Sequence, residues 1–257
     1  MEDPYVTYKP KYMETVWWLL KQIYNKDLMY KGYTIQPYSP KSGTGLRSHE
    51  LNQPGTYQDV TDTTITAMFE VLPQGLPQGL AGIEELYVLA WTTTPWTLPS
   101  NTALTVGPKI KYAVVHTYNQ YTFAPMAVIL AEPLIAKQFI GKYVQVEQRE
   151  ALATYNANEP KIPYWVGDTF LGTELVGIRY AQLIPGVLPF DHPENAFRVI
   201  SGDFVTTEDG TGIVHIAPTF GADDAKVAKE ATPEVHYNGF HNERELIEDE
   251  DCEACKL

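Results

Sequence analysis

The spacing of apolar and polar positions predicts a chain built mainly from short strands, with few helices. Apolar residues recur at helical spacing between Tyr12 and Leu28, which predicts an amphipathic helix. Residues 126–140 form an apolar run of helical length and predict a packed helix with a break near Pro133. Alternating or continuous apolar runs predict strands at residues 32–38, 63–71, 86–93, 102–106, 111–118, 121–124, 143–149, 197–200, 204–207 and 213–217.

The C-terminal half is divided by prolines and ends in a short helix. Residues 154–196 carry five prolines and predict a loop-rich region with short strands at 174–177 and 179–183. Residues 221–231 predict a helix with Asp223 and Asp224 in its first turn, where the helix dipole favours acids. Short strands with a few helices on the flank predict an α+β fold, mainly β, with a β-barrel core.

The expected domain organisation has three parts. Residues 1–50 are expected to form a stalk with one helix, residues 51–231 the β-barrel domain, and residues 232–257 an acidic, mobile C-terminal segment. No apolar run is long enough to span a bilayer and no secretory signal is evident, so a cytoplasmic protein without membrane contact is expected.

Charge and cysteine content narrow the possible functions. The net charge of −13 comes from 19 basic and 32 acidic residues. It argues against a protein that binds nucleic acid over much of its surface, because phosphate binding needs clustered Lys and Arg. A nucleic-acid partner is therefore expected only if a small part of this surface binds it, or if another part of a larger protein does. Cys252 and Cys255 supply half of a zinc site with no second half, so neither a metal nor another cofactor is expected.

A threonine-rich stretch follows the strand predicted at residues 86–93. Thr92, Thr93, Thr94 and Thr97 lie among Trp91, Trp96, Pro95 and Pro99, and the stretch ends at Asn101. The two prolines cannot continue a central strand, so the hydroxyls are expected on a rigid, exposed turn. Such a turn can admit or refuse a small ligand by shape. The alternative interpretation is that strand-end threonines are simply good β-formers.

A second motif runs from Gly210 to Asp224 as Gly-Thr-Gly-Ile-Val-His-Ile-Ala-Pro-Thr-Phe-Gly-Ala-Asp-Asp. The two motifs together resemble the signatures of the editing domain inserted in isoleucyl-tRNA synthetase, most closely its eukaryote-like branch. The editing domain is of the type shared by the valyl, isoleucyl and leucyl enzymes. The third threonine, Thr94, is discriminating, because the related valyl and leucyl enzymes usually have Arg there.

The resemblance covers roughly Pro4 to Glu230 and includes a stalk-like lead-in at residues 25–50. The ATP-site signatures of the synthetase do not occur. By resemblance, the chain is an excised editing domain that cannot activate amino acids. The implied partners are the 3′ end of tRNA(Ile) carrying valine and the remainder of the synthetase.

The resemblance also implies roles for individual residues. Thr92, Thr93 and Thr94 would form one wall of a pocket that accepts valine and excludes isoleucine. Asp224, nine residues after His215 as in the family, would bind the α-ammonium, and Asp223 would begin a helix or lie beside the substrate. Thr97 and Asn101 would hold the terminal adenosine or orient water. Trp91 and Gly212 complete the expected substrate site.

Two questions stay open at this stage. His215 could be a second pocket wall or a general base, and no nearby carboxylate in the sequence obviously orients it. The chain could be a deacylase that hydrolyses Val-tRNA(Ile), a non-catalytic module that binds the aminoacylated tRNA end, or a small-molecule esterase. Release of valine from tRNA by the purified chain separates the first two, and activity on simple amino-acid esters would indicate the third.

Overall fold

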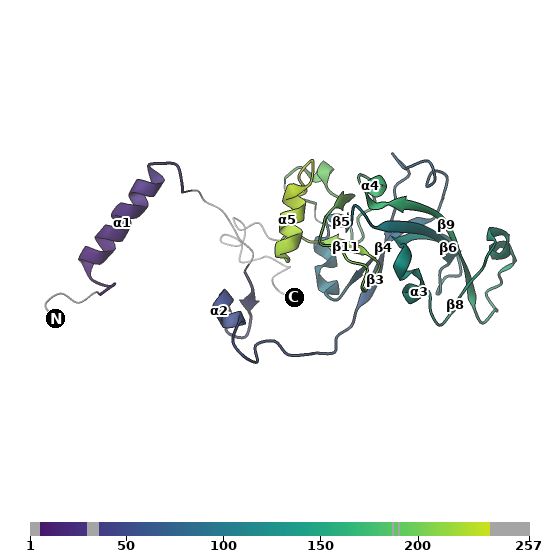
Figure 1. Ribbon diagram of the computed structural model, residues 1–257, viewed down its shortest axis with the longest axis horizontal. Coiled ribbons are helices and arrows are strands. Elements are labelled where there is room, and N and C mark those ends of the chain that lie inside the picture. The colour runs from purple at the N-terminus through teal and green to yellow at the C-terminus, as the bar shows by residue number, and fades with distance from the viewer. Residues whose placement is uncertain (1–5, 30–35, 187, 190, 237–257) are drawn as a thin grey trace. The chain divides into compact units, whose positions relative to one another are not determined.

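A computed structural model of the chain describes residues 6–29, 36–186, 188–189 and 191–236 (Figure 1). The chain divides into two compact units, Met1–Thr56 and Tyr57–Leu257. The acidic segment after residue 236, both cysteines and most of the strand expected at residues 32–38 lie outside the described residues. The three expected domain boundaries remain predictions.

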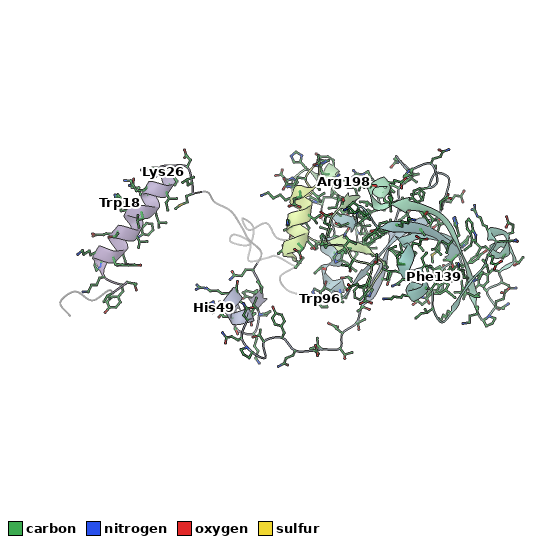
Figure 2. All side chains as sticks on the ribbon, viewed as in Figure 1. Trp18, Lys26, His49, Trp96, Phe139 and Arg198 are labelled. Carbon is green, nitrogen blue, oxygen red and sulfur yellow. The ribbon has the colours of Figure 1, made fainter. Side chains whose placement is uncertain are left out.

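The first unit contains the expected amphipathic helix, α1, which spans Pro10–Tyr24 with proline at its first turn. None of its residues is buried. Its aromatic and aliphatic side chains project outward, as Figure 2 shows for Trp18, which is 60% exposed. A two-stranded antiparallel ribbon, β1 (Tyr38–Ser39) and β2 (Thr44–Gly45), and the short helix α2 (Ser48–Leu51) complete the described part of this unit.

The second unit contains two sheets. The larger sheet has six strands in the order β3, β4, β7, β6, β9, β8, and the smaller has three in the order β10, β5, β11. The larger sheet comprises β3 (Ile65–Glu70), β4 (Leu86–Thr92), β7 (Pro125–Ala131), β6 (Lys111–Tyr118), β9 (Ile162–Leu171) and β8 (Tyr143–Gln145). The smaller comprises β10 (Arg198–Ser201), β5 (Ala103–Val106) and β11 (Ile213–Ile216).

Short helices connect and cover these sheets. They are η1 (Pro95–Ser100), η2 (Glu132–Leu134), α3 (Ile135–Gln138), η3 (Arg149–Thr154), α4 (Gly172–Leu175), η4 (Pro193–Asn195) and α5 (Ala222–Glu230). The expected mixed fold dominated by strands is thereby confirmed. The described strands do not close into the expected barrel, because the larger sheet is open at β3 and β8 and the smaller at β10 and β11.

Three apolar clusters show how the layers are stacked. The largest cluster takes residues from both sheets and includes Phe69, Leu104 and Ile213, so it fills the space between the sheets. A second cluster covers the other face of the larger sheet, where Ile135 of α3 packs. The third joins the outer face of the smaller sheet to Val227 of α5, which lies beside β5 and β11 in Figure 1.

The helix expected at residues 126–140 is wrong for its first half. Residues 125–131 form β7, which is buried between β4 and β6 in the larger sheet. A strand that packs on both faces is continuously apolar, and periodicity alone cannot distinguish it from a buried helix. Helical structure begins at Glu132, followed by Pro133, and ends at Gln138.

The loop-rich region was also only partly predicted. Residues 162–171 form β9, although Pro163 lies near its start. Pro163 lies beyond the last residue pair between β9 and β6, which joins His116 to Trp165, so its missing backbone donor interrupts no pair of that ladder. Residues 172–175 form the helix α4 and not the expected strand, with the Glu174 carboxylate accepting a hydrogen bond from the Leu171 N–H at 2.7 Å.

Phe69 gives a test of the core between the sheets. Its side chain is fully buried and contacts the edge of the Tyr180 ring, with centroids 5.2 Å apart. We expect Phe69→Ala to lower the free energy of unfolding by about 3–5 kcal/mol, because it leaves a cavity in this core. Urea unfolding of the 257-residue chain measures the change. Tyr121→Ala, at a side chain 78% exposed, should change stability by less than about 0.5 kcal/mol, and equal effects would contradict this packing.

Candidate functional site

The threonine stretch begins at the last residue of β4 and continues into η1. Thr92 ends the strand, where it pairs with Ile65 of β3, and Pro95 begins the 3-10 turn. The Thr92 and Thr94 hydroxyls lie 3.2 Å apart, and the Thr94 N–H donates to the Thr92 hydroxyl at 3.1 Å. The turn is less exposed than expected: Thr92 and Thr97 are buried and Thr94 is half-buried, while Thr93 is exposed.

A buried hydrogen bond joins this stretch to the second motif. Thr97 Oγ1 lies 3.1 Å from Nε2 of His215, a residue of β11 that is 118 positions away in the sequence. Thr97 donates its own proton to the Thr94 carbonyl at 2.8 Å. Because a hydroxyl carries one proton, its oxygen must accept from His215, so the imidazole proton is on Nε2.

His215 is a neutral imidazole whose second nitrogen, Nδ1, can accept a hydrogen bond. Burial lowers the pKa of His215 to about 4, so the ring is uncharged at neutral pH. Its Nδ1 atom is buried and, within the described residues, has no hydrogen-bond partner. An unpaired buried acceptor is costly, which marks this lone pair as a place where a ligand donor could bind.

Asp224 is held at the far end of β11. It lies in the first turn of α5, and its Oδ2 accepts a hydrogen bond from the Ala217 N–H at 2.9 Å. Gly221 leaves the room for this contact, since a Cβ there would come within 2.9 Å of the Asp224 carboxyl carbon. Burial raises the pKa of Asp224, while the Ala217 N–H opposes the rise.

The backbone from Ile216, the last residue of β11, to Ala217 links Asp224 to the end of the threonine stretch. Thr102 donates its N–H to the Ile216 carbonyl at 2.9 Å, directly before the residue that binds Asp224. Among the described residues, no hydrogen bond or ion pair joins Asp224 to Thr92, Thr93 or Thr94. A cavity shared by these groups therefore stays a prediction. Asp223 is exposed beside Asp224, as its expected place at the helix start allows.

Asn101 has an internal set of partners in this structure. It is 2% exposed, donates to the Ala103 carbonyl at 2.8 Å and accepts from the Tyr180 hydroxyl at 2.7 Å. Both ends of its amide are thus engaged in holding the turn against the core. Its expected contact with the terminal adenosine stays a prediction, and the described geometry gives it a positioning role.

Trp91 and Gly212 line one cavity of about 210 Å³, together with Phe204, Thr206 and Val214. Trp91 points to the opposite face of β4 from Thr92, because side chains alternate along a strand. Gly212 has φ of +72°, and a Cβ there would lie 2.4 Å from the Ala131 Cβ, so no other residue fits without a shift.

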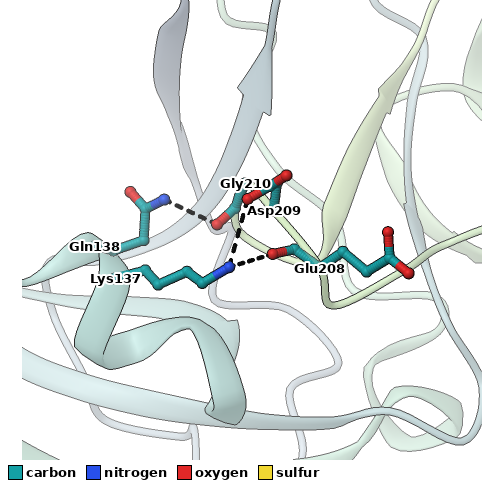
Figure 3. Close-up of polar contacts among 5 residues, drawn as sticks. All are labelled: Lys137, Gln138, Glu208, Asp209 and Gly210. Carbon is teal, nitrogen blue, oxygen red and sulfur yellow. Dashed lines mark hydrogen bonds and ion pairs between the residues drawn. The ribbon is translucent and has the colours of Figure 1, made fainter.

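The glycine loop at residues 208–212 is held from outside by residues that the sequence analysis did not identify. Figure 3 shows Lys137 Nζ donating to the Glu208 carbonyl and Gln138 Nε2 donating to the Gly210 carbonyl, the latter at 2.8 Å. Lys137 also lies 3.4 Å from the Asp209 carboxylate. No signal in the sequence connects this pair with the glycine loop.

The buried hydroxyl of Tyr112 completes this support. It donates to the Gly212 carbonyl at 2.7 Å and accepts from the Gly107 N–H at 2.9 Å, and burial raises its pKa to about 12. The Ala131 N–H donates to the Thr211 carbonyl at 2.8 Å. These contacts fix the backbone that leads into β11 and thereby place His215.

No group of three or more His, Cys, Asp or Glu side chains among the described residues could hold a metal ion. The helices of the described ranges also include none that is long and apolar enough to cross a membrane. The groups that the site presents are hydroxyls, a neutral imidazole, a partly buried carboxylate and backbone N–H groups.

Known proteins are similar to this chain in sequence. Residues 1–222 match the family model for tRNA synthetases class I (I, L, M and V). An isoleucine--tRNA ligase of Bacteroides fragilis is 58% identical over 231 residues, which cover 90% of this chain and 20% of that protein. An isoleucine--tRNA ligase of Porphyromonas gingivalis is 57% identical with the same coverage, and one of Clostridium tetani is 42% identical over 89% of this chain and 18% of that protein. These three relatives are bacterial.

Solved structures give a more distant likeness. The crystal structure of GlLeuRS-CP1 matches with a TM-score of 0.46 and 17% identity, over 65% of this chain and 59% of that one. The editing domain of the P. knowlesi cytosolic leucyl-tRNA synthetase matches with a TM-score of 0.41 and 13% identity, over 63% and 60%. These TM-scores are too low to establish a shared fold.

The chain spans about a fifth of the length of the curated relatives that it matches. The resemblance to isoleucyl-tRNA synthetase that the two motifs carry is confirmed by the identity with these ligases. From the family match over residues 1–222, the chain belongs to the class I tRNA synthetases (I, L, M and V).

Proposed function

We propose that this chain is the proofreading part of an isoleucyl-tRNA synthetase and hydrolyses the ester bond of Val-tRNA(Ile). The observation that carries the proposal is the buried hydrogen bond between Thr97 and His215, which joins the threonine stretch to the second motif. The isoleucine--tRNA ligase relatives supply the family context. The rest of such a synthetase would be the covalent partner, and the location would be cytoplasmic.

Size discrimination explains why such a site is needed. A hydrophobic pocket distinguishes two side chains that differ by one methylene by only about 10–200-fold, a range for which isoleucyl-tRNA synthetase itself is the standard example. A second site that admits valine and excludes isoleucine corrects the remaining errors. Thr92, Thr94 and His215 would form its walls, because their hydrogen bonds limit their freedom to move aside.

Asp224 would bind the α-ammonium of the aminoacyl group. Its carboxylate already accepts from the Ala217 N–H and retains one oxygen for a charge-assisted hydrogen bond to the substrate. Partial burial strengthens such a contact, since less water screens it. Hydrolysis then needs an oriented water and oxyanion donors, and the adjacent ribose hydroxyl could assist.

His215 fits the role of a wall better than that of a general base. An imidazole with a pKa of about 4 is a weak base at neutral pH, where efficient proton acceptors have a pKa closer to the working pH. Its unpaired Nδ1 can still accept a hydrogen bond from a substrate hydroxyl or from water. His215 would therefore orient a group without removing its proton.

The first test replaces the proposed ammonium-binding carboxylate. Asp224→Asn keeps an oxygen for the Ala217 N–H but removes the charge, and we expect deacylation of Val-tRNA(Ile) by the purified chain to slow by about 10–150-fold. Glu230→Gln, at an exposed acid in the last turn of the same helix, is the control and should retain the rate. An unchanged rate in Asp224→Asn would exclude this role for Asp224. If the wild-type chain releases no valine above the buffer rate, the result would favour a non-catalytic module that binds the tRNA end.

Thr94 tests the pocket wall. We expect Thr94→Ala to enlarge the pocket, so that correctly charged Ile-tRNA(Ile) is hydrolysed about tenfold faster or more than by the wild type. The measurement is single-turnover release of isoleucine, with the exposed Thr169→Ala as control. Continued full resistance of Ile-tRNA(Ile) to Thr94→Ala would remove this residue from the wall.

The burial of neutral His215 predicts a pH dependence of stability. The folded pKa is about 4 and the ordinary value is 6.5, so between them the unfolded chain binds a proton that the folded chain does not. The stability that this difference provides is complete above pH 6.5 and decreases as pH falls, by about 1.4 kcal/mol per pH unit. Between pH 7 and pH 5 the wild type should lose about 2 kcal/mol more than His215→Asn in urea unfolding. Parallel pH profiles would contradict a buried neutral imidazole.

A further inference from the structure

A second cavity lies at the other end of the larger sheet, away from the threonine stretch. It has a volume of about 190 Å³ and is lined by side chains of β6, β9, η3 and the loop before β4: Ile83, Val114, His116, Arg149, Trp165 and Asp168. The backbone of Gly79 and Gly82 forms its remaining rim. None of these residues belongs to the two sequence motifs.

Strand pairing shows how far this cavity is from His215 and the threonines. His116 of β6 pairs with Ala127 of β7, which pairs in turn with Leu86, the first residue of β4. Thr92 is the last residue of β4, six positions further along the strand. At about 3.3 Å per residue, the two sites are separated by roughly 20 Å along the strand direction.

Two side chains of opposite charge, Arg149 and Asp168, line the cavity. Both are exposed, and across the described ranges no ion pair joins them to each other or to another residue. Burial and the charge of Arg149 lower the pKa of His116, against the opposing effect of Asp168, which disfavours a second positive charge in the cavity. The two opposite charges are thus available to a ligand.

The remaining walls are aromatic and aliphatic. The Arg149 guanidinium lies 5.9 Å from the centroid of the Trp165 ring, and the His116 ring lies 5.4 Å from the same ring. The first contact limits the freedom of Arg149, and both contacts engage the Trp165 ring. Val114 and Ile83 contribute the aliphatic surface.

We propose that this cavity binds a free α-amino acid with a small aliphatic side chain. The ligand carboxylate would pair with Arg149, the ammonium with Asp168, and the side chain would contact Ile83 and Val114. Asp168 opposes a phosphate group, and the Trp165 ring is already in contact with two side chains, so a nucleic-acid base is disfavoured. This inference does not depend on the proposed hydrolysis.

The affinity should be weak, because both charged side chains are exposed to water. Exposed ion pairs contribute little individually, which places the dissociation constant on the order of 1 mM. Such a site would respond to the free amino-acid pool at high concentration.

The test follows the indole N–H signal of Trp165 by NMR, assigned through Trp165→Phe among the five tryptophans. L-Valine should shift this signal with a dissociation constant near 1 mM, whereas isobutylamine, which lacks the carboxylate, and isovalerate, which lacks the amine, should bind at least tenfold more weakly. Equal shifts with all three compounds, or none with valine at tens of millimolar, on the order of ten times the expected constant, would overturn the proposal.

Charge variants give the second arm. Arg149→Gln and Asp168→Asn should each weaken valine binding about tenfold or more, while the exposed controls Lys142→Gln and Glu147→Gln, which make the same charge changes, should not. Should a variant unfold, as a shift of the Trp91 indole signal to the random-coil position would reveal, the three compounds on the wild-type chain still decide the question. Asp224→Asn should retain the shift, which separates this cavity from the proposed hydrolytic site.

A short single-stranded RNA tests the alternative ligand. If it shifts the Trp165 signal more than valine does, the cavity is a nucleic-acid contact and not an amino-acid site.

Discussion

The hydrogen bond between Thr97 and His215 is the contact on which the candidate site depends. It brings together two segments 118 residues apart, and it lies in a buried region where water cannot substitute for either partner. Because the Thr97 proton is committed to the Thr94 carbonyl, the bond also fixes the imidazole tautomer and leaves Nδ1 as the vacant acceptor. The position of the threonines and the chemical state of His215 are therefore set together.

Support for this contact comes from the helix α3 and from β6 of the larger sheet. Lys137, Gln138 and Tyr112 bind the carbonyls of the glycine loop, and β11 begins immediately after it (Figure 3). A loop with two glycines at positive φ would otherwise be free to move, since glycine has the widest conformational choice of any residue. Anchoring its carbonyls from two elements, α3 and β6, removes that freedom and holds His215 against Thr97.

Local sequence patterns predicted much of the fold near the site. The apolar run that predicted β4, the Gly-Thr-Gly turn before β11 and the acids at the start of α5 all describe local structure, and each element is found where expected. Strand β7 was mistaken for a helix because both its faces are buried, which removes the alternation that identifies a strand. The open sheets differ from the expected barrel for a related reason: strand order depends on pairings between distant segments, which no local pattern records.

The site was predicted in its residue types more than in its contacts. The resemblance to the isoleucyl enzyme pointed to the threonines, His215 and Asp224, but neither the partner of His215 nor the Ala217 contact of Asp224 follows from spacing. Asn101 shows the same limit, because its polar side chain suggested a ligand contact while its amide is engaged by Tyr180 and Ala103. Supporting residues such as Gln138 carry no motif and could be found only in three dimensions.

A crystal structure of the chain with a non-hydrolysable valyl-adenosine analogue would test the central claim most directly. The account predicts that the α-ammonium lies within hydrogen-bond distance of the Asp224 carboxylate, with the isopropyl group against Thr92, Thr94 and His215. An analogue whose ammonium meets a different carboxylate, or whose side chain lies away from both sequence motifs, would contradict it.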